Sequence, residues 1–184
     1  MDSVRVEQLE SDGLVRVTWL PYELHPEAPP EGIARDAYFG RARSERMHAH
    51  LQSIAESVGL KMESRDVIIN SRRALSAAEF AREHGMFDEM HHLLFKAHWE
   101  GSGKLEQVDD LVRIGTEVGL DADDLRAALD EQRYDLVIDE HRRAATSVGI
   151  DAIPAHVFGR RYLVLGAQPY EVLRQVVDRL NATE

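Results

Sequence analysis

The stretch that decides the fold is GIDAIPAHVFGRRYLVLGAQPYEVL, Gly149 to Leu173. Two short runs typical of β-strands, AHVF and RYLVL, are separated by Gly159 and Arg160, which predicts an antiparallel hairpin. Pro169 then stands at the first position of an expected helix. The apolar residues of that helix recur at helical spacing: Tyr170, Leu173, Val176, Val177 and Leu180.

A proline, Pro154, stands directly before the hairpin. On the residues alone it is most simply a trans proline that begins an edge strand, because trans is the preferred form of an X–Pro bond. A cis bond would instead turn the chain so that the backbone of Ile153 faces outward.

Upstream of this stretch, one strand pattern is followed by a long helical region. GLVRVTWLPYEL is apolar around Leu14, Val15, Val17 and Trp19, which predicts a buried strand that ends at Pro21. From Asp36 to Gly149 the apolar spacing predicts helices around residues 47–58, 74–81, 86–97, 105–112 and 134–145, with a further helix that begins at Asp121. The order strand, five or six helices, strand, strand, helix predicts an α/β fold.

The start of one of these helices is specified in detail by the sequence LDADDL. Asp121 can cap the free backbone N–H groups of the first turn, and Leu120 and Leu125 stand at the two positions of a hydrophobic staple.

The composition excludes several classes of function. With 22 basic and 33 acidic residues the net charge is −11, and no basic stripe offsets it, so nucleic acid is not expected as a partner. No apolar run approaches the roughly 20 residues that span a bilayer. The first residues show neither the basic nor the apolar region of a signal peptide, so we expect no membrane partner and a cytoplasmic location. The 184 residues contain no cysteine.

Three segments resemble the DsbA-like thioredoxin superfamily, specifically its FrnE-type branch. VTWLPYELHPEAPPEG resembles that family's second strand and the loop after it, and SRRALSAAEFAREHGMFDEMHHLLFKAHW resembles its central helices. GIDAIPAHVFGRRYLVLGAQPYEVL resembles its cis-proline loop, hairpin and final helix. The resemblance implies a thioredoxin-like sheet formed by residues 1–35 and 150–184, with an all-helical insertion formed by residues 36–149.

The resemblance also implies a substrate site. The family consists of dithiol–disulfide oxidoreductases, and no cofactor is expected. Pro154 matches the cis-proline, and Ile153 matches the residue whose N–H and C=O pair with an extended peptide or thiol substrate. His156 and His25, the latter in a loop near the family's active centre, are further candidates for this site. For His25 the alternative is a loop histidine that bonds to backbone.

The chain departs from the family pattern at its start. RVEQLESDGL resembles the end of the family's first helix, so we expect the first strand, the Cys-x-x-Cys and the front of that helix to be missing, most simply through a late start of the reading frame. A thiolate of lowered pKa is the nucleophile of dithiol exchange. We therefore assign no catalytic residue and expect the chain as it stands to be redox-inactive. The incomplete sheet could be repaired by a strand in SVRVEQL or by a homodimer.

Two alternatives to the oxidoreductase family remain. One is a redox-dead binding protein that keeps the groove around Pro154, and the other is a glutathione-using isomerase or kappa-type transferase. YELHPE and GAQPYE favour the oxidoreductase branch over the transferase.

Two other clusters could hold a ligand. His91, His92 and Glu89 could bind a metal, but they fit a solvated helix face better, and no metal is assigned. Arg72 and Arg73 could meet an anionic ligand, or they could pair with nearby carboxylates.

Overall fold

The computed structural model describes residues 2–57, 59, 62–63 and 66–182. The chain divides into two compact units, one formed by residues 1–20 with 144–184 and the other by residues 21–143. The domain boundaries expected from the sequence, at 35/36 and 149/150, stay a prediction. None of the described helices is long and apolar enough to cross a bilayer.

The first unit is built on the predicted hairpin. Strand β3 (Ala155–Phe158) pairs antiparallel with β4 (Tyr162–Leu165), and His156 lies opposite Val164. Gly159 and Arg160 have φ values of 54° and 58°, and the Arg161 N–H donates to the Phe158 carbonyl at 2.9 Å. Both central residues of the turn are thus left-handed, which is the type I′ geometry that matches the twist of a hairpin. The hairpin prediction is confirmed.

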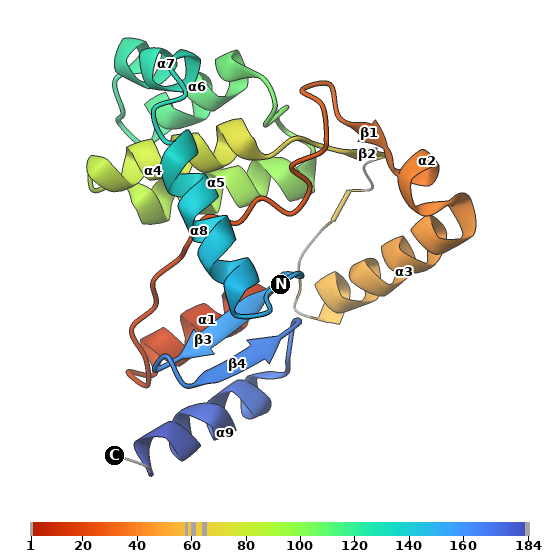
Figure 1. Ribbon diagram of the computed structural model, residues 1–184, viewed down its shortest axis with the longest axis vertical. Helices are drawn as coiled ribbons and strands as arrows, with labels where there is room; N and C mark the ends of the chain where they lie inside the picture. Colours follow the sequence, from red (N-terminus) through yellow and green to blue (C-terminus); the bar gives the residue numbers. More distant parts are fainter. Residues whose placement is uncertain (1, 58, 60–61, 64–65, 183–184) are drawn as a thin grey trace. The chain divides into compact units, whose positions relative to one another are not determined.

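Two helices, α1 (Asp2–Ser11) and α9 (Tyr170–Asn181), pack beside this hairpin (Figure 1). Val6 and Leu9 of α1 meet Leu173 of α9 in a buried cluster, against which Phe158 and Val164 of the hairpin pack. Pro169 is the residue before α9 and not its first residue, a difference of one position at a helix end.

The segment around Leu14 is not a strand. Residues 15–20 carry no assigned secondary structure, although Val15, Val17 and Trp19 still pack against the buried cluster of the first unit. A strand requires a neighbour that completes its ladder of hydrogen bonds, and no described segment pairs with this one. The prediction of a buried strand at this place is therefore wrong.

The suggestion that SVRVEQL repairs the sheet as a strand is also wrong, because these residues lie in α1. Val6 and Leu9 are 6% and 1% exposed, three positions apart, which puts them on one face of a helix. Arg5 ties this helix to the loop before α9, since its guanidinium donates to the carbonyls of Ala167 and Gln168 at 3.3 and 3.0 Å.

The second unit is mainly helical, as predicted. Its helices are α2 (Arg35–Phe39), α3 (Arg41–Ser57), α4 (Arg72–Glu83), α5 (Phe87–Glu100), α6 (Val108–Glu117), α7 (Ala122–Asp130) and the greater part of α8 (Asp135–Ser147). Neither α2 nor a two-residue pairing of β1 (Ile33–Ala34) with β2 (Val67–Ile68) was predicted. Residue 58, the last of the helix expected around residues 47–58, lies outside the described residues.

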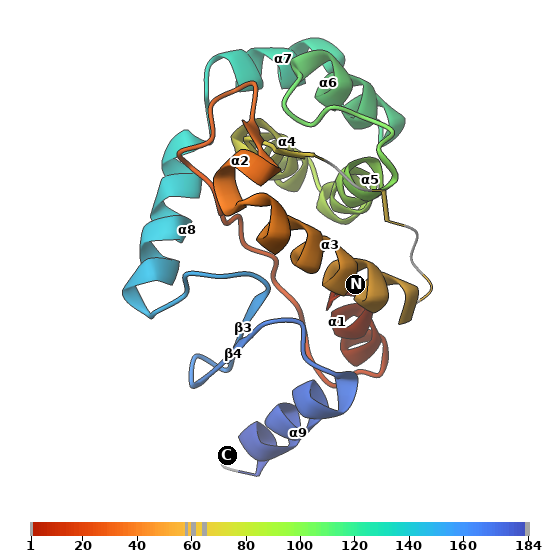
Figure 2. The same cartoon turned by 90° about the vertical axis from the view of Figure 1, so that its right-hand side faces the viewer.

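Helices α4 to α7 form the core of this unit and lie side by side in Figures 1 and 2. Their fully buried residues include Ala77 and Phe80 on α4, Met90 on α5 and Leu111 on α6. The alanines of α4 are buried in this core.

The start of α7 follows the sequence prediction. Asp121 Oδ1 accepts the N–H groups of Asp123 and Asp124, each at 3.0 Å, and Leu120 and Leu125 are 6% and 0% exposed. Asp121 thus satisfies two of the helix's free donors while the two leucines are buried.

A buried ion pair ties the segment before α2 to α4 and α8. Glu23 is 1% exposed, and its carboxylate oxygens accept from Arg72 Nε at 3.3 Å and from Arg72 Nη2 at 2.6 Å. The same guanidinium lies 2.7 Å from Asp139 and 3.5 Å from Asp135. The hydrogen bond to Glu23 is the main cause that raises the pKa of Arg72 above its usual value. Of the two roles considered for Arg72, the structure supports pairing with carboxylates.

Candidate substrate-binding site

The loop before β3 presents Ile153 to solvent. The Ile153–Pro154 peptide bond is cis, as the resemblance implied. The Pro154 carbonyl accepts the Gly166 N–H at 2.8 Å, so the loop is fixed to the far end of β4. The Ile153 side chain is 49% exposed, and among the described residues nothing hydrogen-bonds to its N–H or C=O. An apolar side chain and two unpaired backbone groups are thus available at the entry to the hairpin.

His156 lies in the same unit but on the other side of its strand. Side chains alternate between the faces of a strand, and the neighbouring Val157 is 55% exposed. The His156 side chain is only 13% exposed, and its Nε2 lies 3.0 Å from Asp2 Oδ2 at the start of α1. His156 therefore faces a carboxylate of its own unit.

His25 lies in the second unit, within a small polar and aromatic cluster. Its Nδ1 is 3.2 Å from Glu27 Oε1, and the same oxygen accepts the Tyr38 hydroxyl at 2.6 Å. The His25 ring meets the rings of Tyr38 and Phe39 edge-on, at centroid distances of 5.3 and 6.2 Å. His25 is thus held by side chains, whereas its alternative role was bonding to backbone.

The electrostatics of this cluster centre on Glu27. The hydrogen bond from Tyr38 is the main cause that lowers the pKa of Glu27 from 4.5 to about 2, and His25 adds to the effect. The same bond raises the pKa of Tyr38, because ionised Tyr38 would lose its hydrogen bond to a carboxylate. Glu27 therefore stays charged down to strongly acidic pH.

Of the four residues expected at the site, Ile153, Pro154 and His156 share one unit and His25 belongs to the other. Their roles in binding stay a prediction. The sequence analysis missed Glu27 and Tyr38 as partners of His25. Glu27 is only two residues from His25 in the same loop, so this pairing could have been predicted from the sequence. Tyr38 lies further along the chain, on α2, and no sequence pattern marks it as a partner.

The chemistry open to these groups is binding and not thiol exchange. With no cysteine in the 184 residues, none of the groups of this chain can attack a disulfide as a thiolate. No three described His, Asp or Glu side chains are arranged to hold a metal ion. His91 stacks with Phe87 and tilts against Phe95 along α5, with ring centroids 5.4 and 4.6 Å away.

A hairpin entered through a cis proline and closed by a terminal helix, joined to a helical unit, defines a thioredoxin-like protein of the DsbA type. Comparison with known families agrees: the DSBA-like thioredoxin domain matches residues 3–178. The chain belongs to this family. The match does not distinguish the FrnE-type branch from others, although it is consistent with it.

Individual relatives are distant in sequence. The chain is 24% identical over 167 residues to the uncharacterized protein YwbO of Bacillus subtilis. This alignment covers 89% of this chain and 82% of that protein. A probable DsbA oxidoreductase from Streptomyces coelicolor superposes with a TM-score of 0.88 at 23% identity, covering 100% of this chain and 84% of that one. A candidate protein disulfide isomerase from Nitrosomonas europaea superposes with a TM-score of 0.63 at 16% identity. This match covers 78% of this chain and 76% of that one. The two structures show the shared fold.

Proposed function

We propose that this chain acts as a binding protein of the DsbA-like family, which takes up extended peptides, thiol-bearing ones included, at Ile153 and the adjoining end of β3. One observation carries the proposal: Ile153 is 49% exposed, and its backbone N–H and C=O have no hydrogen-bond partner among the described residues. An extended peptide can satisfy both groups by adding as a strand.

The surroundings of Ile153 support this kind of ligand. The Gly166–Pro154 hydrogen bond holds the loop in place, so little ordering is needed on binding. On the hairpin face opposite to His156, Val157 and its cross-strand partner Leu163 are 55% and 40% exposed. These side chains offer apolar contacts to alternate residues of an added strand.

The proposed activity is binding without electron transfer. Exchange between a dithiol and a disulfide proceeds through a mixed disulfide and needs an attacking thiolate. This polypeptide has none, so it would hold a thiol-bearing peptide without oxidising or reducing it.

A peptide titration tests the proposal. A fluorescently labelled, extended eight-residue peptide with a central cysteine would be titrated with the 184-residue chain under reducing conditions, and binding followed by anisotropy and by amide chemical shifts. We expect shifts at residues 153–157 and an affinity at least about tenfold weaker for Ile153→Asp, which corresponds to 1.4 kcal/mol. The control is Val172→Asp, which places the same charge at another apolar side chain, 37% exposed on α9.

The proposal is wrong if the peptide binds the wild type and the Ile153→Asp variant equally well, or if it binds neither. A parallel titration with glutathione distinguishes the kappa-type alternative. Binding of glutathione but not of the extended peptide would favour that branch.

Two further expectations belong to this proposal. A cytoplasmic location stays a prediction, which fractionation of cells that express a tagged chain would test. A homodimer also stays a prediction, and sedimentation equilibrium over a range of protein concentrations would test it.

A further inference from the structure

Strand β3 has a free edge, because it pairs with no described strand other than β4. The hydrogen bond from the Gly166 N–H to the Pro154 carbonyl decides which residues of β3 face that edge. In an antiparallel pair, opposite residues alternate between hydrogen-bonded and non-hydrogen-bonded positions. Pro154 and Gly166 continue the β3–β4 register by one position and are bonded, so Ala155 and Val157 occupy non-hydrogen-bonded positions. The N–H and C=O groups of Ala155 and Val157 therefore point away from β4.

These backbone groups have no partner in the part of the chain that the structure describes. No hydrogen bond joins the N–H or C=O of Ala155 or Val157 to a segment beyond the hairpin. Ile153, two residues before Ala155, likewise has an unpaired N–H and C=O. Unpaired groups thus recur at every second residue along one edge, which is a template for the addition of a further strand.

The other edge of the hairpin, along β4, is less free. Leu163 and Leu165 face that edge by the same alternation, but the Leu165 carbonyl accepts the side-chain amide of Gln168 at 2.9 Å. Proteins commonly protect an edge strand with charged side chains. Residues 152–159, which include β3, contain no Lys, Arg, Asp or Glu. We therefore expect an added strand at β3 and not at β4.

The distribution of charge favours a second copy of this chain as the source of that strand. Residues 1–20 and 144–184, which form the first unit, contain 6 basic and 8 acidic residues, a net charge of −2. The second unit therefore carries −9 of the total net charge of −11. Two copies would repel each other through their second units, whereas contact through the hairpin keeps this repulsion low.

The edge of β3 is also complementary to itself. Antiparallel pairing about a two-fold axis at His156 sets Ala155 opposite Val157 of the second copy, and Val157 opposite Ala155 of the second copy. Each of these opposite pairs exchanges two hydrogen bonds, so every group that Ala155 and Val157 present at the edge is satisfied. His156 lies on the axis, and its own N–H and C=O belong to the ladder with Val164 of β4. Such a symmetric contact closes at two copies.

We propose that two copies of this chain pair through the free edges of β3, and that this pairing masks the peptide site at Ile153. The strands of the resulting sheet follow the order β4, β3, β3, β4. In this register Gly159 of the second copy lies opposite Ile153, where an added peptide would otherwise pair. A peptide and a second copy therefore compete for one edge. The competition rests on the peptide-binding role proposed for Ile153, whereas the pairing rests on the geometry and charge of the first unit alone.

Sedimentation equilibrium of the full 184-residue chain, from low to high micromolar concentration, tests the pairing. We expect the wild type to pass from monomer to dimer over this range. Val157→Pro removes a donor from the free edge only, because the Val157 N–H points away from β4 and an edge strand tolerates proline there. It should weaken the dimer at least about tenfold. The matched control is Leu163→Pro at the residue opposite Val157, which removes a donor from the edge of β4 and should leave the dimer unchanged.

A second pair of variants keeps the test valid if proline disturbs the hairpin. Val157→Lys and Leu163→Lys replace side chains that are 55% and 40% exposed, so both variants should keep the circular dichroism spectrum of the wild type. Lysine on an edge strand opposes pairing with another chain. Val157→Lys should therefore weaken the dimer, whereas Leu163→Lys should not.

Addition of the extended peptide at saturating concentration should shift the wild type from dimer to monomer. The pairing is overturned if the wild type stays a monomer at high micromolar concentration, if both Val157 variants dimerise like the wild type, or if the Leu163 variants weaken the dimer as much as the Val157 variants. The competition is overturned if saturating peptide leaves the dimer intact. A peptide that binds neither monomer nor dimer refutes the function proposed for Ile153 and the competition with it, while sedimentation without peptide decides the pairing.

Discussion

Replacing Arg72 by Met tests the importance of the buried ion pair in the helical unit. Glu23 is 1% exposed and accepts two hydrogen bonds from Arg72, at 2.6 and 3.3 Å. Met keeps much of the apolar stem but leaves the Glu23 carboxylate buried without its partner. Breaking a buried pair in this way costs about 3–5 kcal/mol. A typical domain is stable by about 5–15 kcal/mol, so the loss would be a large part of the total.

Urea unfolding at neutral pH, followed by tryptophan fluorescence and circular dichroism, measures the effect as a lower midpoint at an unchanged slope. The matched control is Arg73→Met, because the neighbouring Arg73 is exposed and bonds to a main-chain carbonyl; it should cost less than about 1 kcal/mol. The double variant Glu23→Leu with Arg72→Met should recover much of the stability, since it leaves no buried charge at Glu23. A loss below about 1 kcal/mol for Arg72→Met alone, equal to that of the control, would refute the reasoning.

Three further predictions concern stability and pH. Gly115→Ala should destabilise by about 1–3 kcal/mol in thermal unfolding, because its Cβ would overlap Leu125 Cδ2; an unchanged melting temperature would contradict the close packing of α6 and α7. Asp121→Ala should cost about 1 kcal/mol by the loss of the α7 cap, and Asp121→Asn should restore most of it, as urea midpoints would show. Hydrogen bonds, foremost the one from Tyr38, lower the pKa of Glu27 from 4.5 to about 2, so the stability from Glu27 is complete above pH 4.5 and is lost as the pH falls toward 2. The Glu27→Gln variant should therefore be less stable than the wild type at neutral pH, and this difference in stability should shrink near pH 2. A difference independent of pH would argue against this assignment.

Features that depend on neighbours in the chain were predicted well from the sequence. The β3–β4 hairpin follows from alternating apolar residues around Gly159 and Arg160, and the start of α7 follows from Asp121. In both cases the interacting groups are only a few residues apart, so the pattern contains the whole interaction. The family resemblance extended the prediction to the fold and to the cis bond before Pro154, which local preference alone disfavours.

Features that depend on distant partners were not predictable in the same way. The residues around Val17 have the composition of a buried strand, but a strand exists only where another segment completes its ladder, and no described segment does so. Tyr38 is 11 residues from Glu27, and Glu23 is 49 residues from Arg72. No periodicity marks such pairs, because they meet only when helices and loops pack.

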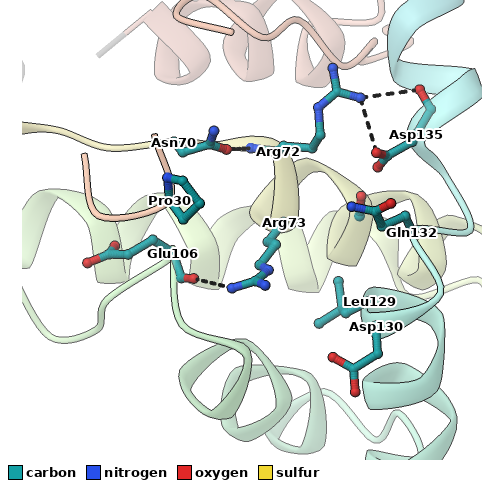
Figure 3. A pocket seen from close by; sticks show the side chains of 10 residues that line it. Pro30, Asn70, Arg72, Arg73, Glu106, Leu129, Asp130, Gln132 and Asp135 are labelled. Carbon is teal, nitrogen blue, oxygen red and sulfur yellow. Dashed lines mark hydrogen bonds and ion pairs between the residues drawn. The ribbon is translucent and has the colours of Figure 1, made fainter. Parts of the chain in front are cut away.

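The sequence by itself determined that this chain has no thiol for disulfide exchange and that its net charge is acidic. It also determined that a long helical region is followed by a hairpin and a final helix. These are properties of composition and of local pattern, which do not depend on packing. The tertiary structure alone decided that Arg72 forms ion pairs with carboxylates, whereas Arg73 donates to a main-chain carbonyl (Figure 3). It also decided that Ser76 and Gln132 line one cavity. The two arginines are adjacent and identical in type, but successive residues of a helix project about 100° apart, so the fold places them in different surroundings.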